Sequence, residues 1–341
     1  GRSSTFRQAG VDTASWPTQD FTVKRISLAF KVNESSAFSF GLKPFSSSNY
    51  LYITDKTLSD NTTGYNKLVQ GSGGVNQVYG SYARVLGKRF SAGATVSYMF
   101  GSLLEDTRYL SQQLPISVTK TTSQLYYGVS GSVGLQYYSL ETKKWQHSLG
   151  LVASIGSALS GENYIEYFED TALLKKEVSD KNSFPLPASV GVGYTLSKNS
   201  KYYFTVEGNY YHWQRTSLNY NQSYTAPAFR FSAGFEYSNK KVYLDWRDNL
   251  RKSLIERSFL GVGINYEKSY MVIKNQPLYD YSFSMGGGLN VSRQLSVYAT
   301  IESGVKGKLI GDQFRERYTQ VVIGLTMKDI WLGPKITRRY R

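Results

Sequence analysis

The stretch FSAGATVSYMF, residues Phe90–Phe100, decides the fold because its apolar and small polar residues alternate. Successive side chains of an extended strand point to opposite faces, so one face is apolar and the other is small and neutral. The apolar face carries Ala92, Ala94, Val96, Tyr98 and Phe100, and the other face carries Ser91, Gly93, Thr95 and Ser97. A soluble sheet usually presents Lys, Glu and Arg to water. The stretch therefore predicts a strand of a transmembrane β-barrel, with its small polar face toward a crowded interior and its aromatic end at the lipid headgroups.

The composition of the whole chain agrees with an all-β protein. Aromatic residues make up 15% of the 341 residues, including 29 Tyr, and the mean hydropathy is −0.37. Such use of Tyr, Gly and Ser favours strands over helices. No apolar run in the sequence approaches the roughly 20 residues of a spanning helix. Because no linker divides the chain, we predict one barrel domain whose strands are only half apolar.

The charge of the chain is strongly positive, but it is spread out. Lys and Arg give a net charge of +15 and lie in turns and loops along the whole sequence rather than in one stripe. This distribution argues against nucleic acid as a partner and favours anionic outer-membrane lipids, including lipopolysaccharide; a role in solubility alone explains it equally well. The absence of Cys excludes disulfides and thiolate metal sites.

The alternation of Phe90–Phe100 recurs in about thirteen segments, which short Lys-bearing turns and longer loops separate in turn. We expect residues 1–20 to form an outer loop, residues 21–330 the antiparallel transmembrane barrel, and residues 331–341 a basic periplasmic tail. Bacterial barrels close with an even number of strands, so a fourteenth strand is expected to precede Gly1. The pattern also predicts one short amphipathic helix within Tyr243–Arg257 and a long outer loop over Ser160–Phe184.

One part of the predicted wall is interrupted. Pro44 removes a ladder hydrogen bond from its strand, and Phe45 begins a polar Ser-rich run. The GSGG sequence that supplies Gly71, Gly73 and Gly74 follows on the next predicted strand. A phosphate-binding loop would need a following Lys-Ser/Thr and a helix, which this sequence does not offer, so a strand kink is the better interpretation.

Several stretches resemble the FadL-like outer-membrane transporters, especially a Gram-negative branch related to barrels of secretion and assembly complexes. The stretches are ISLAFKV and FSFGLKPFSSSNY near the start, QGSGGVNQVYGSY and FSAGATVSYMFGSL after them, and INYEKSYMVIKNQPLYDYSFSMGGGLNVS and YTQVVIGLTMKDIW near the end. The resemblance implies a fourteen-stranded barrel in the outer membrane with an N-terminal hatch in its lumen. It also implies a kink in the third strand, where Pro44 lies, through which a hydrophobic ligand leaves sideways.

The chain has few residues of the kinds that catalyse reactions, with two His and no Cys. His147 and His212 are the two histidines of the chain, and their parity with apolar residues points them toward lipid. A Ser-His hydrolase therefore remains a minor alternative, and we predict no enzyme activity, no cofactor and no metal site.

Four charged residues share strand faces with small polar residues and are expected to point into the lumen. They are Glu207, Arg230, Glu236 and Glu302. Mutual structural pairing is the favoured explanation, and a substrate track is the alternative. The tryptophans at strand ends, among them Trp145 and Trp213, are expected to anchor the barrel at the membrane interface.

Two functions follow for a barrel in the outer membrane of a Gram-negative bacterium. In the first, it binds small hydrophobic molecules and passes them through a lateral opening near Pro44. In the second, it is a non-catalytic scaffold or accessory subunit of a larger outer-membrane assembly or secretion complex. Its docking surfaces would be Tyr243–Arg257, Ser160–Phe184 and the tail Lys335–Arg341. An open apolar path would favour passage, and a filled lumen would favour the scaffold.

Overall fold

The computed structural model describes residues 1–8, 16–57, 64–111, 117–139, 144–170, 172–214, 217–218, 223–245, 251–273, 275–292, 294–308 and 314–328. Every regular element in these ranges is a β-strand, and every strand pairing in them is antiparallel. The described ranges contain no helix of the length and apolarity needed to cross a membrane. The predicted all-β, antiparallel fold class is therefore confirmed.

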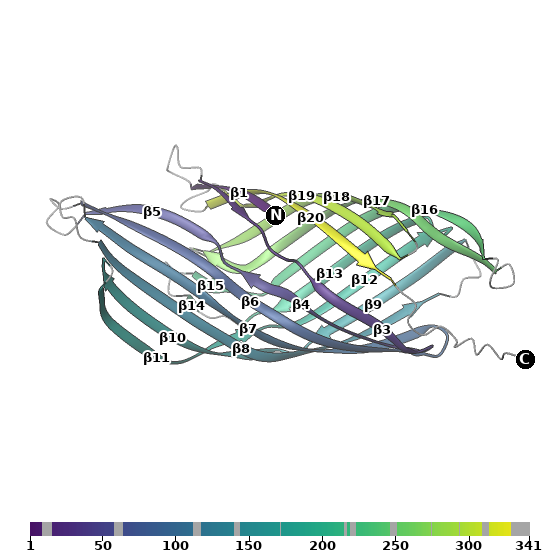
Figure 1. Cartoon of the computed structure of the whole chain (residues 1–341), viewed down its shortest axis with the longest axis horizontal. Helices are drawn as coiled ribbons and strands as arrows, with labels where there is room; N and C mark the ends of the chain where they lie inside the picture. Colours follow the sequence, from purple (N-terminus) through teal and green to yellow (C-terminus); the bar gives the residue numbers. More distant parts are fainter. Residues whose placement is uncertain are drawn as a thin grey trace, which may run out of the picture.

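Figure 1 shows the strands tilted around a long barrel, with most turns gathered at its two ends. Twenty strand segments are present in the described residues. They are β1 (Arg2–Gln8), β2 (Trp16–Asp20), β3 (Ile26–Asn33), β4 (Ser36–Ser47), β5 (Tyr50–Thr57), β6 (Gly64–Leu86), β7 (Phe90–Ser111), β8 (Ser117–Tyr138), β9 (Trp145–Ser154), β10 (Ser157–Glu169), β11 (Ala172–Leu186), β12 (Ala188–Lys198), β13 (Tyr202–His212), β14 (Ser217–Leu218), β15 (Ser223–Thr225), β16 (Ala228–Asp245), β17 (Arg251–Ile273), β18 (Gln276–Asn290), β19 (Leu295–Gly307) and β20 (Phe314–Met327).

Several neighbouring segments are two pieces of one strand that crosses the wall. For example, β9 and β10 both pair with β8, and β12 and β11 pair with them in turn. Six such joins (β2 with β3, β4 with β5, β9 with β10, β11 with β12, β13 with β14, β15 with β16) reduce the twenty segments to fourteen crossings. This is the even number that an antiparallel barrel requires.

The first of these crossings is short and lies where a loop is predicted. β1 and β2 form strands within residues 1–20, so the expectation of an outer loop over this whole range is wrong. The alternation is hidden because Ser3 and Thr5, on the outward side of β1, are polar, and Arg2 and Ser4 point inward. Such a strand lacks the apolar face that marks the others.

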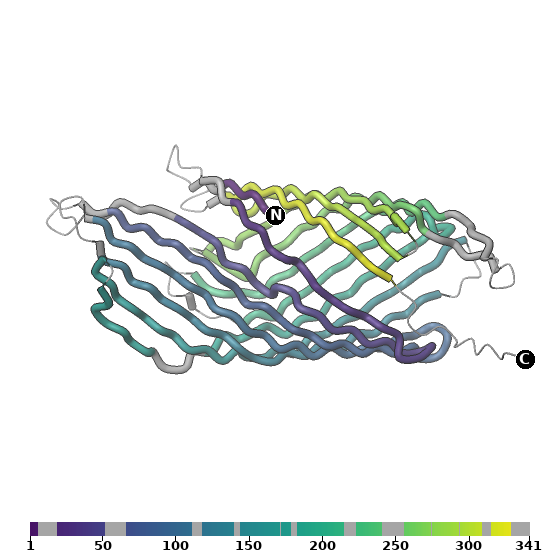
Figure 2. The backbone as a smooth tube through the Cα atoms, viewed as in Figure 1, coloured from purple at the N-terminus to yellow at the C-terminus, as the bar shows by residue number. Residues whose placement is uncertain are grey.

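β1 leaves a seam in the wall. It pairs with β2 and with the first half of β20, and Gly1 exchanges two backbone hydrogen bonds of 2.8 Å with Val321. Beyond this contact, the stretch Val322–Met327 pairs only with β19, and β3 pairs only with β4, within the described residues. Ile323 and Met327 are 73% and 84% exposed. Figure 2 shows this first part of the chain, in purple, beside the yellow last strand.

Two predictions about connections are wrong. Ser160–Phe184 lies in β10 and β11, which pair along nearly their whole length. Tyr243–Arg257 contributes to β16 and β17 rather than to a helix. In the ladder, Leu244 lies opposite Lys252 and Leu254 lies opposite Val242, so the backbone of this segment is paired as two strands. Leu250 lies outside the described residues.

The alternation of Phe90–Phe100 holds in the structure. On β7, Val96 is 62% exposed on the outer face, and Tyr98 stacks on Phe100 with ring centroids 6.1 Å apart. Met99, on the inner face, is 4% exposed. The outward rows of apolar side chains on the other strands are likewise exposed, as expected for a surface that meets lipid rather than water.

Candidate functional site

The predicted kink lies in β4. The register between β4 and β6 shifts between Pro44 and Ser46, so that Phe45 is an extra residue without a partner on β6. Proline cannot donate a hydrogen bond to the ladder, and a bulge at this point removes the need for one. The bulge therefore bends the wall at the position that the sequence indicates.

The glycines opposite the bulge are required by close approach. Gly73 has a φ of 101°, and a Cβ atom there would overlap the carbonyl oxygen of Ser102. A Cβ atom on Gly74 would overlap the carbonyl oxygen of Ser46, and one on Gly71 would overlap the ring of Tyr50. The structure thus brings Pro44, Phe45, Gly71, Gly73 and Gly74 into one kinked region of β4, β5 and β6.

A small cavity lies beside this kink, at the seam. Its volume is about 220 Å³, and Pro44 and Phe45 contribute to one side of it. Arg2 and Gln320 contribute from β1 and β20, and Lys24 donates a hydrogen bond of 3.3 Å to Gln320. Most of the lining is polar, so the cavity is not an apolar exit. A lateral opening at Pro44 stays a prediction.

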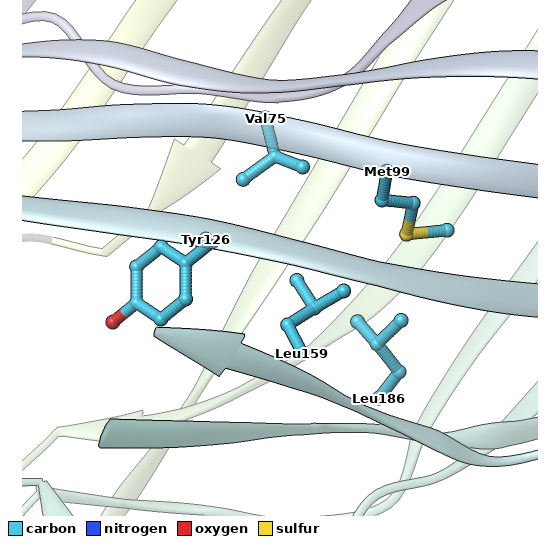
Figure 3. Close-up of a cluster of buried hydrophobic side chains, with 5 residues drawn as sticks. All are labelled: Val75, Met99, Tyr126, Leu159 and Leu186. Atoms are coloured by element: carbon cyan, nitrogen blue, oxygen red, sulfur yellow. The ribbon is translucent and has the colours of Figure 1, made fainter. Parts of the chain in front are cut away.

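An apolar cluster occupies the inner face of the wall next to the kink (Figure 3). It consists of Val75, Met99, Tyr126, Leu159 and Leu186, which are 2% to 7% exposed. Val75 directly follows Gly74, so the cluster begins where the kink ends. Leu103 and Phe184 pack against these five side chains. The inner face here is filled by packed side chains and does not line a channel.

Aromatic rings continue this cluster across the lumen side. Tyr126 contacts Phe184, Phe184 contacts Trp213, and Trp213 stacks on Tyr270 with ring centroids 4.3 Å apart. The prediction that Trp213 anchors the barrel at the membrane interface is therefore wrong. Trp145 is exposed at the start of β9, with the Lys198 ammonium 4.9 Å from its ring centroid, and its role as an interface anchor stays a prediction.

This cluster is absent from the sequence predictions, although one signal for it exists. Met99 and Leu103 fall on the face of β7 that otherwise carries Ser, Gly and Thr. Two large apolar residues on a polar face indicate that this face is covered. The covering residues come from β10 and β11: Leu159 and Leu186 flank the range Ser160–Phe184 that the sequence pattern assigns to a loop, and Phe184 ends it.

The opposite side of the lumen is charged. Arg230 forms an ion pair of 2.5 Å with Glu267, and Asn209 donates a hydrogen bond of 2.6 Å to Glu207. Glu236 lies opposite Tyr203 and Gly261 in the ladder. The predicted lumen charges do not pair with each other in these contacts. Arg230 and Glu207 instead contact Glu267 and Asn209, which the sequence pattern does not single out.

A second polar group holds β1 against the end of the sheet. Arg2 pairs with Glu316 at 2.5 Å, and its guanidinium lies 4.2 Å from the ring centroid of Tyr318. The Tyr318 hydroxyl donates a hydrogen bond of 3.0 Å to Asp280 and lies 3.4 Å from Glu302. These contacts connect β1, β18, β19 and β20 from inside the lumen.

The two histidines have aromatic neighbours. Nδ1 of His147 lies 2.6 Å from the hydroxyl of Tyr194, and the ring of His212 lies 6.4 Å from that of Tyr210. These contacts do not resemble the Ser-His pair of a hydrolase. In the ranges that the structure covers, no three His, Cys, Asp or Glu side chains are arranged to hold a metal ion.

Comparison with solved structures identifies the fold. The chain is similar to the CymD monoaromatic hydrocarbon channel (14% identity, TM-score 0.59, 96% of this chain and 86% of that one). It is also similar to a Pseudomonas aeruginosa FadL homologue (12%, 0.59, 95% and 86%) and to the Ralstonia pickettii toluene transporter TbuX (14%, 0.55, 96% and 89%). At these identities the likeness shows the fold alone, which is the FadL-type outer-membrane barrel.

Comparison at the level of sequence gives the family. No curated protein matches the chain. A family model described as BamG matches residues 1–336, nearly the whole length. The family therefore takes the form of a FadL-like barrel in this chain. The chain belongs to the BamG family.

Proposed function

We propose that this barrel is a non-catalytic subunit of a larger assembly complex in the outer membrane of a Gram-negative bacterium. The observation that carries the proposal is the β16–β17 ribbon. Its six residue pairs, from Lys240–Glu256 to Asp245–Arg251, continue past the ends of the neighbouring strands. BamG family membership supports an assembly context.

The ribbon departs from the other connections at its end of the barrel. The turns at residues 34–35, 87–89 and 199–201 are short. β13 begins at Tyr202, opposite Tyr237, and β18 reaches only the level of Ser258. Beyond these levels, the two ribbon strands pair with each other alone in the described part of the chain. An isolated two-stranded ribbon is marginally stable in water, so a docking partner would stabilise it.

The interior supports the same proposal. The apolar side chains that face the lumen are packed against each other, with no more than 7% exposed in the central five. A channel for hydrophobic molecules needs such side chains to line a hollow instead. The filled region therefore favours a scaffold, in which the barrel is a rigid body that presents surfaces to other outer-membrane proteins.

Shortening the ribbon tests this function. Replacement of residues 240–256 by a two-residue Asn-Gly turn should leave the barrel folded and heat-modifiable on gels, but it should reduce the size of the native complex extracted in mild detergent. A matched shortening of the connection between β5 and β6, residues 58–63, serves as the control. An unchanged complex with the short ribbon would contradict the proposal.

Passage of a small hydrophobic molecule is the second candidate function. The observation that favours it is the contact between the kink and the apolar cluster at Gly74 and Val75, together with the FadL-type fold. In this proposal, loosening of the bulge at Phe45 opens a lateral path near Pro44. The expectation of a fourteenth strand before Gly1 rests on a count of thirteen, and that count is wrong, because the described residues already form fourteen crossings.

A further inference from the structure

The outer face of the wall is hollowed over β16, β17, β18, β19, β20 and β1. The hollow has a volume of about 940 Å³. Phe231, Ile264, Tyr281 and Phe283 contribute apolar surface, and the small side chain of Ser303 lies between the larger ones. These residues occupy outward positions, which face lipid in a barrel. The hollow is therefore a lipid-facing groove rather than part of the lumen.

The inner and outer faces of these strands differ in charge. Inward positions carry both signs, with the acidic residues Glu267, Asp280, Glu302 and Glu316 beside the basic residues Arg2 and Lys306. The basic side chains at outward positions lie toward the loop end of the barrel, and they are Lys268, Arg315 and Arg317, with Lys308 just beyond β19. The Lys308 ammonium lies 5.8 Å from the ring centroid of Tyr279, on this outer face. The rim of the groove is thus cationic.

One of these cations has an unmet bonding requirement. Nε of Arg315 is buried and has no hydrogen-bond partner among the described residues. Buried polar atoms in folded proteins are nearly always paired with protein, water or a ligand. Arg317 lines the groove, and Arg315 lies two residues away on the same face of β20, about 6.8 Å from Arg317 at the backbone. A phosphate group is of a size to accept hydrogen bonds from both guanidinium groups.

We propose that this groove binds one phosphorylated lipid of the outer leaflet, of the lipid A type. Its phosphate lies at Arg315 and Arg317, and its acyl chains run over Ser303 between Tyr281 and Phe283. The long-loop end of the barrel faces the cell exterior in the expected orientation, and lipid A there presents both phosphate and several acyl chains. The inference does not depend on the proposed assembly function.

The test is a binding titration of the purified barrel in detergent with lipid A, read by native mass spectrometry. A cation near an anionic lipid surface contributes about 1 kcal/mol, so each of Arg315→Gln and Arg317→Gln should weaken binding roughly fivefold, and the double variant roughly twenty-five-fold. Arg84→Gln removes an exposed outward cation at the short-turn end and should change the affinity less than about twofold.

A steric variant separates the groove from the charges. Ser303→Trp fills the hollow without a change of charge and should also weaken lipid A binding, whereas Ala299→Trp, on the same strand nearer the other end, should not. Three results would overturn the proposal: wild-type affinity in both the double arginine and Ser303→Trp variants, an equal loss in Arg84→Gln, or equal affinity for phosphatidylglycerol. Heat-modifiable mobility checks that each variant is folded.

Discussion

Two regions of the same wall are stabilised from inside by different means. Around β7, β8, β10 and β11 the inner face is a packed apolar cluster with Leu159 at its centre. Around β16 to β20 and β1 the inner face carries ion pairs and hydrogen bonds, such as Arg230–Glu267 and Arg2–Glu316. The backbone ladder is the same in both regions. The inner face of the wall can therefore be stabilised in two ways: apolar side chains can be packed against each other, or charged side chains can be paired.

The difference teaches where the barrel tolerates change. Packed apolar side chains lose free energy steeply when a charge is introduced, because the charge has no partner. A partly exposed ion pair such as Arg230–Glu267 contributes little, because water screens it. The apolar region should thus be the rigid side of the molecule, and the charged region the adaptable one.

The largest effect is expected from Leu159→Asp. Leu159 is 2% exposed, so the carboxylate would be buried among apolar side chains. We expect a loss of about 4 kcal/mol or more in the free energy of unfolding, measured by urea titration in detergent. Ser130→Asp, on the polar inner face of β8, is the matched control. Similar losses in both variants would show that the two kinds of inner face do not differ.

The next effect concerns the outer face. Val192→Arg places a charge on the lipid side of β12, and we expect a loss of about 2 to 4 kcal/mol if the residue lies near the bilayer midplane. Ser189→Arg, on the inner face of the same strand, should cost less. Refolding into vesicles at a series of urea concentrations measures both values. Equal tolerance would contradict the assignment of faces.

A smaller effect is expected in the charged region. The Arg230 and Glu267 side chains are 47% and 28% exposed, so the ion pair is partly screened. A double-mutant cycle with Arg230→Gln and Glu267→Gln should give a coupling free energy below about 1 kcal/mol. A coupling several times larger would mean that the lumen is dry at this level, and that both regions are rigid.

The smallest effect on stability is expected at the kink. Pro44→Ala restores a backbone N–H beside a bulge that already lacks a ladder bond, so the free energy of unfolding should change by less than about 1 kcal/mol. If the barrel passes hydrophobic molecules, the same variant should slow the uptake of a labelled hydrophobic probe by cells. An unchanged uptake rate would remove Pro44 from that mechanism.

The sequence predicts the strand faces and the kink well, because both are local. Alternation with period two assigns Val96 and Ser97 to opposite faces, and Pro44 cannot donate a ladder bond wherever the chain goes. Side-chain partners on different strands are not local in the sequence. Arg230 pairs with Glu267 on the neighbouring β17 rather than with another predicted charge, and Trp213 stacks on Tyr270, because the register between strands decides these contacts.

Segments without clean alternation account for the remaining errors. Tyr243–Arg257 suits a helical face and a paired ribbon equally, so periodicity alone does not separate the two. Ser160–Phe184 is rich in charged and polar residues, yet it pairs as β10 and β11, whose residues Leu159, Phe184 and Leu186 pack with Met99. In that segment tertiary contacts overrode the local pattern.

The hydrogen bonds between Gly1 and Val321 lead to an expectation about the order in which the barrel folds. They join residues 320 positions apart, which is the most expensive kind of contact to form early because the intervening chain must be ordered first. The hairpins between neighbouring strands, such as β6 with β7, have no such cost. The wall should therefore assemble by successive hairpins, and the junction of β1 with β20 should be made last.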